Sequence, residues 1–350
     1  MKKKLLGVAL MVVPFVLLAA GLANGANGGT VLDRLTALES RVTALETFVG
    51  MPSPSPSTSP SPSPSTSPSP SPSPTAAGPP IVIVFMENQE ATDIVGNPNS
   101  PYLNSLIAQG TLFTNYTEGD PTGPSLPDYL EVVAGSRCGA SSDSVSAGQF
   151  DASQGCGTTV WNQLEASGFS WGVFMDAMPA PCYSGTSYSN TALDTPYVLK
   201  HNPATPFASI FGDETLCAAH VLPFTSFNPN ALPAVSFVAP GICNNHHGST
   251  STQWSDCLPK SAALYARGDS WLQTNIGPAI SAGADVFITY DESDVLYAVG
   301  VGPSFAAGTT DARAFNHYST LAGLEDAFGL ARLNNASSAT PLPISPRISA

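Results

Sequence analysis

The sequence predicts a doubly wound α/β domain, with a mostly parallel central sheet and helices on both faces. The first observation is an unbroken apolar, β-branched run at Ile81–Met86, as expected of a strand buried on both faces. Similar short runs follow at 171–175, 235–239 and 286–290. Stretches with helical periodicity lie between the runs, at 101–109, 160–167 and 270–282. Strands that alternate with helices favour a parallel sheet, in which ligands bind beyond the carboxyl ends of the strands.

The chain begins with the features of an export signal. Three lysines at 2–4 form a basic segment, and an apolar run follows at 5–23. Small residues near Ala23 would suit cleavage, but the run is also long enough for an uncleaved anchor. We therefore expect residues 1–29 to be a signal peptide or a signal anchor. The rest of the chain would then be extracellular, either secreted or anchored to the outer face of the cell membrane.

Residues 30–50 are predicted to form a short coiled-coil stalk. Apolar side chains recur at alternating spacings of four and three, at Val31, Leu35, Leu38, Val42, Leu45 and Val49. An Arg-apolar-x-x-apolar-Glu pattern, which starts at Arg34 and again at Arg41, resembles the trimerisation motif of short parallel coiled coils. The pattern therefore favours a homo-oligomer, most readily a trimer, formed through 31–49. A solitary amphipathic helix or a linker is the alternative, because about three heptads is near the lower limit for a coiled coil.

A spacer and a globular domain follow the stalk. Residues 51–79 are almost wholly Pro, Ser and Thr repeats, which favour an extended, semi-rigid linker. The composition then becomes that of a globular domain, expected at 80–335 and followed by a tail at 336–350. Beyond residue 50 the chain has seven Lys and Arg against twenty-three Asp and Glu. Because no basic stripe could neutralise phosphates, this acidic balance argues against a nucleic-acid partner.

All six cysteines lie in this domain, at Cys138, Cys156, Cys182, Cys217, Cys243 and Cys257. An even number in an exported chain predicts disulfides, and no Cys-x-x-Cys spacing indicates zinc. Three bridges allow 15 connectivities. Proximity alone suggests sequential pairing, that is 138 with 156, 182 with 217 and 243 with 257.

The segment 119–135 is predicted to be a loop that opens a helix. Pro121 and the Gly123-Pro124 pair favour a turn, helical periodicity follows, and Gly135 supplies a stop. Ser125 is therefore expected at the N-cap, where free backbone N–H groups and the helix dipole would suit a nucleophilic hydroxyl or a bound phosphate. The alternative is structural, because Ser125 with Asp128 also matches a capping box.

Polar residues follow directly after three of the predicted strands. Glu87 and Asn88 follow the first strand, His246 and His247 lie beyond the third, and Asp291 and Glu292 follow the fourth. Carboxylate, amide and imidazole groups that meet at one edge of a sheet would suit a hard or borderline divalent metal. Taken singly, each group could instead be a solvated turn, a surface histidine or a helix cap. Their common position after buried strands favours a shared site.

The order of these motifs also resembles a known family. The motifs are Met86-Glu-Asn88, Gly123-Pro-Ser-Leu-Pro-Asp-Tyr129, Lys200-His-Asn-Pro203, Cys243 to His247, Thr289-Tyr-Asp-Glu292, Asn316-His-Tyr-Ser319 and Glu325 to Leu330. Together they are similar to the bacterial phosphoesterase family that contains secreted acid phosphatases, phosphatidylinositol 3-phosphatases and phospholipases C, a branch of the alkaline phosphatase superfamily. The resemblance covers nearly all of 80–335, and it implies an alkaline-phosphatase-like fold.

The resemblance also implies roles for particular residues. The metal would be held by Glu87, Asn88, Asp291 and Glu292. Ser125 would be the nucleophile, and His201 and His247 would contact the phosphoryl group or the leaving oxygen. His317 would support the site from the following helix, with a capping or packing role as the alternative, and His246 is a further supporting candidate.

The expected function is that of a metal-dependent phosphomonoesterase of the acid phosphatase type, acting through a phosphoserine. A phospholipid or phosphoinositide is among the candidate phosphate-ester substrates. The chain departs from the family pattern, which has His at Gly123, Asn at Asp128, and a further His and Asp at Asn244 and Asn245. Two rival interpretations therefore stay open. They are a phosphodiesterase of the phospholipase C type and a surface-displayed binding module without catalysis.

Overall fold

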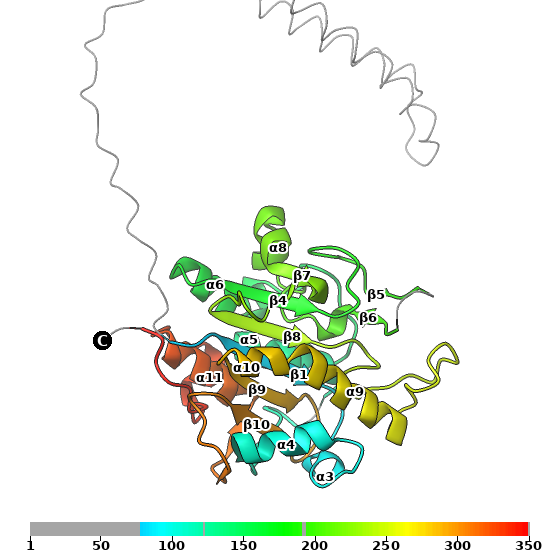
Figure 1. Ribbon diagram of the computed structural model, residues 1–350. Helices are drawn as coiled ribbons and strands as arrows, with labels where there is room; N and C mark the ends of the chain where they lie inside the picture. The colour runs from blue at the N-terminus through cyan, green and yellow to red at the C-terminus, as the bar shows by residue number, and fades with distance from the viewer. Residues whose placement is uncertain (1–77, 122, 191–193, 349–350) are drawn as a thin grey trace, which may run out of the picture. The chain divides into compact units, whose positions relative to one another are not determined.

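The computed structural model describes residues 78–121, 123–190 and 194–348 (Figure 1). The predicted signal at 1–29, the coiled coil at 31–49 and nearly all of the linker at 51–79 lie outside the described residues. Within the described part, no helix combines the length and the apolar character that crossing a membrane requires. The described residues belong to one compact unit of the chain.

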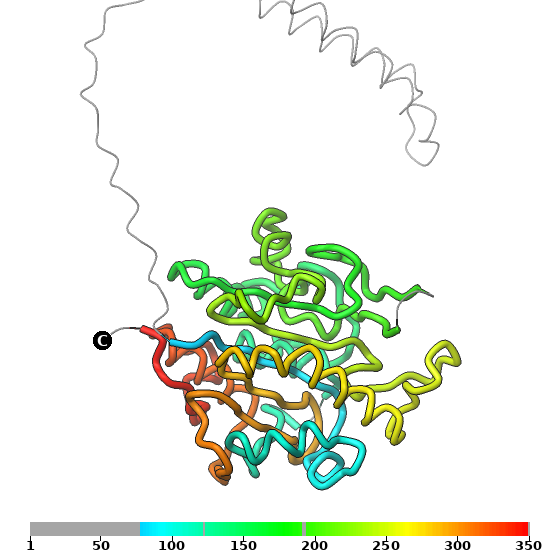
Figure 2. The backbone as a smooth tube through the Cα atoms, in the orientation of Figure 1, coloured from blue at the N-terminus to red at the C-terminus, as the bar shows by residue number. Residues whose placement is uncertain are grey.

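An eight-stranded sheet forms the centre of the domain, in the order β11-β2-β10-β9-β1-β8-β4-β7. Strands β1 (Ile81–Met86), β8 (Val235–Ala239), β4 (Trp171–Met175), β7 (Val221–Pro223) and β9 (Asp285–Tyr290) run parallel to one another. Figure 2 shows β1, in blue, running through the middle of the domain. Every residue of β1 is buried, as its unbroken apolar run predicts.

The other edge of the sheet is mixed. Strand β10 (Ala298–Val301) pairs antiparallel with β9 and with β2 (Thr111–Phe113), and β11 (Thr309–Asp311) pairs parallel with β2. Two further pairs are small: β12 (Phe315–Asn316) with β3 (Tyr116–Thr117), and β5 (Ser187–Tyr188) with β6 (Tyr197–Val198). The mostly parallel α/β prediction is confirmed.

Helices cover the sheet in two groups. Helices α4 (Pro101–Gln109), α9 (Ala262–Asn275) and α10 (Gly277–Ser281) pack together, and α9 and α10 cross in front of the sheet in Figure 1. Helix α5 (Ser125–Ala134) lies behind the sheet and packs against α6 (Val160–Ala166) and α11 (His317–Ala327). The remaining helices are α3 (Ala91–Ile94), α7 (Ala208–Phe211), α8 (Glu214–His220) and the 3-10 turns η1 (Ala152–Gln154), η2 (Leu199–His201), η3 (Phe224–Ser226) and η4 (Asn334–Ser338).

One predicted helix has the wrong boundaries. The stretch 270–282 is not a single helix, because α9 starts at Ala262 and a second helix, α10, starts at Gly277. The Ser261 hydroxyl caps α9 by accepting a hydrogen bond from the Leu264 N–H. Pro278, near the start of α10, has no N–H to continue the hydrogen bonds of α9.

The sequential disulfide pairing is confirmed. The bridges join Cys138 to Cys156, Cys182 to Cys217 and Cys243 to Cys257. Each bridge closes a short loop, with sequence separations of 18, 35 and 14 residues. The first loop follows α5, and the third contains His247, so two of the bridges restrain segments next to the polar cluster described below.

The two ends of the described chain meet at one side of the domain. Arg347 forms a buried ion pair with Asp285, the first residue of β9, and its side chain also lies against Gly78. Leu342 is 1% exposed, so residues from the last segment contribute to the core. Figure 2 shows the blue start and the red end of the described domain close together.

Candidate active site

Three carboxylates meet at the carboxyl ends of two neighbouring strands. Glu87 directly follows β1, and Asp291 and Glu292 directly follow β9. Because Met86 and Tyr290 are register partners, the residues after them emerge side by side. Each carboxylate offers an oxygen within 4.8 Å of the others, although Glu87 is more than two hundred positions from Asp291 and Glu292 along the chain.

Because the carboxylates are buried close together, keeping all of them ionised costs free energy. Glu87 and Asp291 have no exposed surface. Burial raises the pKa of Glu87, and burial together with the nearby Glu87 and Glu292 raises the pKa of Asp291 well above its usual range. Among the described residues, Asp291 Oδ2 has no hydrogen-bond partner. A buried group of oxygens with an unsatisfied carboxylate fits a hard or borderline divalent cation, which would offset the crowded negative charge.

Asn88 lies in the same cluster. Its backbone is in the left-handed region, with φ of 49°, and its N–H donates to Asp291 Oδ1 at 2.8 Å. The side-chain amide nitrogen donates to Glu292 Oε1. The structure therefore brings Asn88 to the carboxylates, with the amide nitrogen rather than the amide oxygen toward Glu292.

Ser125 lies against the carboxylates but not at the predicted helix position. The N-cap of α5 is Pro124, and Ser125 is the first residue of the helix, so the N-cap assignment was wrong by one position. Its hydroxyl lies 3.0 Å from Glu292 Oε1 and 3.2 Å from Glu87 Oε2. These contacts of the hydroxyl are with side chains, and Ser125 is not the N-cap residue, so the capping-box alternative does not describe this serine.

Lys200 and Asp143 complete the surroundings of the serine, and the sequence analysis missed both. Lys200 Nζ lies 3.3 Å from Ser125 Oγ and 2.7 Å from Asp143 Oδ2. Asp143 Oδ1 also accepts the Leu126 N–H at 3.1 Å, which places this carboxylate at the start of α5. The signal for Lys200 was its position beside His201 in the family motif. Asp143 lies in no recognised motif, and its contact with Lys200 spans 57 residues of sequence.

His201 lies next to Glu87. Its Nε2 lies 3.0 Å from Glu87 Oε1, and its ring stacks on Tyr129 with centroids 5.1 Å apart. The Tyr129 hydroxyl donates to the same Glu87 oxygen at 2.6 Å. Burial, with the positive charge of Lys200 nearby, holds the pKa of His201 well below its usual range. His201 is therefore a neutral imidazole beside the carboxylate.

His247 lies next to His201, with ring centroids 5.9 Å apart. Its Nδ1 donates to the Gly248 carbonyl at 2.8 Å, which leaves Nε2 as the ring nitrogen without a partner in that contact. The two asparagines that depart from the family pattern have structural contacts. Asn245 accepts the His247 N–H with its side chain and the Glu87 N–H with its carbonyl, and Asn244 links Asp176 to Arg267.

His246 and His317 pack behind the cluster. His246 Nδ1 contacts the Tyr290 hydroxyl at 2.8 Å and Nε2 contacts the Tyr265 carbonyl at 3.2 Å, which joins β9 to α9. Burial lowers the pKa of His246 to about 4, so the ring is neutral. His317 is the first residue of α11 and is also fully buried. Neither ring contacts the three carboxylates directly in any hydrogen bond or ion pair among the described residues.

Gly123 has a specific neighbour. A Cβ atom at this position would collide with the guanidinium of Arg137. Arg137 is mostly buried and pairs with Asp120 at 3.0 Å. Where the family pattern has a histidine, this chain therefore has a glycine whose missing side chain leaves room for an arginine.

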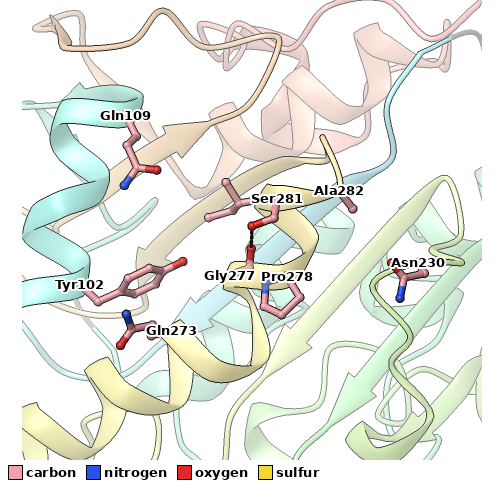
Figure 3. A pocket seen from close by; sticks show the side chains of 9 residues that line it. Tyr102, Gln109, Asn230, Gln273, Gly277, Pro278, Ser281 and Ala282 are labelled. Carbon is pink, nitrogen blue, oxygen red and sulfur yellow. Dashed lines mark hydrogen bonds between the residues drawn. The ribbon is translucent and has the colours of Figure 1, made fainter.

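Two cavities lie at different places in the fold. A cavity of about 240 Å³ is lined by Asp143, Ser144, Val145, Thr186, Val198 and Lys200, and therefore adjoins Ser125 through Lys200. A larger cavity of about 670 Å³ lies between α4, α10 and the segment around Asn230 (Figure 3). Its lining includes Tyr102 and Gln273 but no carboxylate, histidine or lysine. The smaller cavity is thus the one that belongs to the polar cluster.

Comparisons with known proteins agree with this arrangement. The model of the Phosphoesterase family matches residues 84–299. A phosphatidylinositol-3-phosphatase from Mycobacterium tuberculosis is 28% identical over 276 residues, which cover 75% of this chain and 81% of the relative. An acid phosphatase from Aspergillus fumigatus is also 28% identical, over 71% of this chain and 55% of the relative, and a probable acid phosphatase from Kluyveromyces lactis is 27% identical, over 72% and 58%. The chain thus spans little more than half the length of these two fungal relatives.

Among solved structures, a protein in the alkaline phosphatase superfamily from Vibrio parahaemolyticus aligns over 75% of this chain and 72% of its own, with 13% identity and a TM-score of 0.48. The family match begins inside β1 and extends into β10, so it includes Glu87, Ser125, Lys200, His247 and Asp291. The chain therefore belongs to the Phosphoesterase family and is a hydrolase that acts on phosphoric ester bonds.

Proposed function

We propose that the protein is a metal-dependent phosphomonoesterase of the acid phosphatase type, which hydrolyses its substrate through a phosphoserine at Ser125. The single observation that carries the proposal is the position of the Ser125 hydroxyl. It is fully buried, and it lies between two carboxylate oxygens on one side and the Lys200 ammonium on the other. A hydroxyl with carboxylate acceptors and a cation beside it suits nucleophilic attack on phosphorus.

Glu87, Asp291 and Glu292 would hold a divalent metal, joined by Asn88 once its amide oxygen turns toward them. When bound, the metal supplies Lewis-acid stabilisation of negative charge on the nucleophile and on the phosphoryl oxygens. Fixed second contacts hold the ligands in place, because Tyr129 donates to Glu87 and the Asn88 N–H donates to Asp291.

The chemical step would use the protein's own groups as follows. Ser125 Oγ forms a bond to phosphorus while the bond from phosphorus to the alcohol oxygen breaks. The hydroxyl proton leaves on the carboxylate side, where Oγ donates to Glu292 or Glu87. The Lys200 ammonium donates to Oγ from the other side and stabilises the charge that develops there.

His201 and His247 would contact the phosphoryl group or the leaving oxygen. Their rings lie 5.9 Å apart, and a proton on His247 Nε2 would pass to the oxygen of the departing alcohol. Water then attacks the phosphoserine and gives up a proton to His247 Nε2. The bond from phosphorus to Oγ breaks, and Oγ takes back the proton that the carboxylate side had accepted.

The alcohol part of the substrate would occupy the cavity of about 240 Å³ beside Lys200. Its lining combines Val145 and Val198 with the hydroxyls of Ser144 and Thr186, which suits a small polyol more than a long acyl chain. The relative named a phosphatidylinositol-3-phosphatase supports testing an inositol phosphate headgroup. We also propose an extracellular protein exported through 1–29, and the three disulfides support this location. The apolar spacing at 31–49 is the basis for proposing that it is an oligomer.

Ser125→Ala tests the proposal. The wild type should hydrolyse an aryl phosphate and, after acid quenching during turnover, carry one phosphate on the peptide that contains Ser125. The variant should lose both properties while it keeps its fold. A variant that retains more than about a tenth of wild-type kcat, a barrier change under about 1.4 kcal/mol, would exclude covalent catalysis at this residue. Hydrolysis of an aryl diester at a comparable rate would favour the phospholipase C type, and no hydrolysis of either would favour a binding module.

A further inference from the structure

A second cluster of metal-ligating side chains lies behind the candidate active site. Asp128 and Glu131 are three residues apart on α5 and therefore share one face of the helix. Both face His317, the first residue of α11, and all three side chains have no exposed surface. Each offers a ligand atom within 4.8 Å of the others. None of the three belongs to the cluster around Ser125.

The contacts inside this cluster are too long for hydrogen bonds. His317 Nδ1 lies 3.6 Å from Asp128 Oδ1 and 3.5 Å from Glu131 Oε2. Charged N–H to carboxylate bonds measure about 2.7–2.9 Å. Among the described residues, His317 Nδ1 and both oxygens of Asp128 have no hydrogen-bond partner, although all are fully buried. Three unsatisfied atoms facing one another in a core require a further partner.

Hydrogen bonds from outside the cluster orient His317 and Glu131, as such bonds do for metal ligands. His317 Nε2 lies 3.2 Å from the Tyr290 carbonyl, which can only accept, so Nε2 carries a proton and Nδ1 is the ring nitrogen that faces the carboxylates. Glu131 is fixed by the Tyr318 hydroxyl at 2.9 Å on Oε1 and by the Gly119 N–H at 3.0 Å on Oε2. The side chains are therefore held in place before any ion binds.

We propose that Asp128, Glu131 and His317 bind a second divalent cation, of the borderline class represented by Zn²⁺, which joins α5 to α11. Zinc lies about 2.0–2.2 Å from nitrogen and carboxylate ligands, so neighbouring ligands in a tetrahedral shell are about 3.4 Å apart. The distances of 3.5 and 3.6 Å from His317 Nδ1 match that spacing. The second oxygen of Asp128 is available as a further ligand.

A bound dication would take the place of a proton. Burial lowers the pKa of His317, but Asp128 and Glu131 outweigh this effect and raise the pKa to about 10. Two carboxylates, a neutral imidazole and a dication sum to zero, whereas a protonated His317 would leave one net negative charge in the core. Among the described residues, Arg137 is a further cation beside the cluster, with its Nε 3.9 Å from Glu131 Oε1, whereas His317 faces Glu131 Oε2. Asp120, at 3.0 Å, balances the charge of Arg137.

The consequence concerns the position of the serine. Asp128 lies one helical turn after Ser125, so an ion at Asp128 fixes the first turn of α5 relative to α11. The site does not depend on the proposed function, because none of its three residues contacts Ser125 or the three strand-end carboxylates in a hydrogen bond or ion pair among the described residues.

Metal stoichiometry tests the proposal. The protein is first unfolded in denaturant without reductant, freed of metal, and refolded with Zn²⁺ or Co²⁺. Elemental mass spectrometry then counts the bound ions per chain, and the visible spectrum of bound Co²⁺ reports on its ligands. The wild type should bind two ions per chain, and Asp291→Asn, which damages the strand-end cluster, should retain one. Asp128→Asn and His317→Gln should each lose one ion in the wild-type background and the remaining ion in the Asp291→Asn background.

Glu325→Gln is the matched control, because Glu325 is another fully buried carboxylate of α11 that lies outside the cluster. It should keep two ions. The proposal would be overturned if the wild type bound one ion, and if this ion were lost in Asp291→Asn but kept in Asp128→Asn. His317 would then hold a proton instead of a metal ion. A wild type that binds two ions but has no phosphatase activity would contradict the proposed function and leave the second metal site standing. Circular dichroism separates metal loss from failure to fold, and His317→Gln gives a second variant if Asp128→Asn does not fold.

Discussion

Lys200 Nζ lies 3.3 Å from Ser125 Oγ and is held there by Asp143, whose Oδ2 is 2.7 Å away. The pKa of Lys200 is raised by the carboxylates of Glu87 and Asp143, against the effect of its own burial, so the group is an ammonium at neutral pH. An ammonium cannot accept the serine proton. Its chemical contribution is therefore to stabilise negative charge on Oγ, and Lys200 is a candidate catalytic residue by contact with the reacting atom.

Replacing Lys200 with Met should lower kcat for an aryl phosphate by about 100-fold or more, because removing one donor to a developing oxyanion costs roughly that factor. Steady-state kinetics with aryl phosphates of different leaving-group acidity would measure it. Lys200→Arg should recover part of the rate, since it restores the charge but not the geometry. Lys260→Met, at an exposed lysine, is the control and should leave kcat unchanged. A Lys200→Met enzyme within threefold of the wild type would exclude this role.

Asp143→Asn should act through Lys200 and not directly. The variant keeps the hydrogen bond from the Leu126 N–H but loses the ion pair that holds the ammonium against Ser125. We expect kcat to fall about 10-fold, with a smaller change in KM, because Asp143 positions a group that acts in the transition state. In a double-mutant cycle, Asp143→Asn should add little to Lys200→Met. Additive losses would show that Asp143 has an independent role.

The sequence was sufficient for the elements whose apolar pattern is local. The run at Ile81–Met86 is buried along its whole length, so its composition alone identified it as a central strand. The same logic placed Glu87 and Asp291 at one edge, because both directly follow such runs. The cysteine pairing was also accessible, since each bridge joins the next cysteine along the chain.

Contacts between distant segments were not accessible in this way. The start of α9 was missed because Asp269, a charged residue in the middle of the pattern, is buried and accepts the Tyr102 and Leu103 N–H groups of α4. The pairing of Lys200 with Asp143 depends on how the fold brings a 3-10 turn to the start of α5. The position of Arg137 beside Gly123 likewise has no spacing signal.

Metal removal and Asp291→Asn should have opposite effects on stability. In the wild type without metal, Asp291 is crowded by Glu87 and Glu292, so chelation should lower the Tm. Asp291→Asn removes one of these buried charges and should raise the Tm of the metal-free protein above that of the metal-free wild type. With metal added, the order should reverse, because the variant has lost a ligand charge. Thermal unfolding followed by circular dichroism, with and without chelator, would show whether the two curves exchange order. An unchanged order in both conditions would argue against a metal at these carboxylates.

The final prediction concerns pH and a carboxylate remote from the candidate active site. Glu325 is fully buried on α11, where it accepts the Leu333 N–H at 2.8 Å, and burial raises its pKa to about 8, while the nearby Arg332 counteracts this only in part. The unfolded chain ionises this group near its ordinary pKa of 4.5. Between these two values the folded protein holds a proton that the unfolded chain has released. Stability from this group is therefore complete below pH 4.5 and is lost as the pH rises toward 8, with a slope of up to about 1.4 kcal/mol per pH unit.

Glu325→Gln imitates the protonated carboxyl and should remove this slope. The variant should match the wild type near pH 4 and exceed its free energy of unfolding by about 1 kcal/mol or more at pH 7, because only the wild type must keep a proton or bury a charge there. Urea unfolding at several pH values would measure the difference, and Glu165→Gln, at an exposed carboxylate of α6, is the control for removing a carboxylate from the surface. If the free energies of Glu325→Gln and the wild type ran parallel from pH 4 to pH 8, the carboxyl of Glu325 would be ionised in the folded protein, and the α11 core would have to accommodate that charge through Arg332.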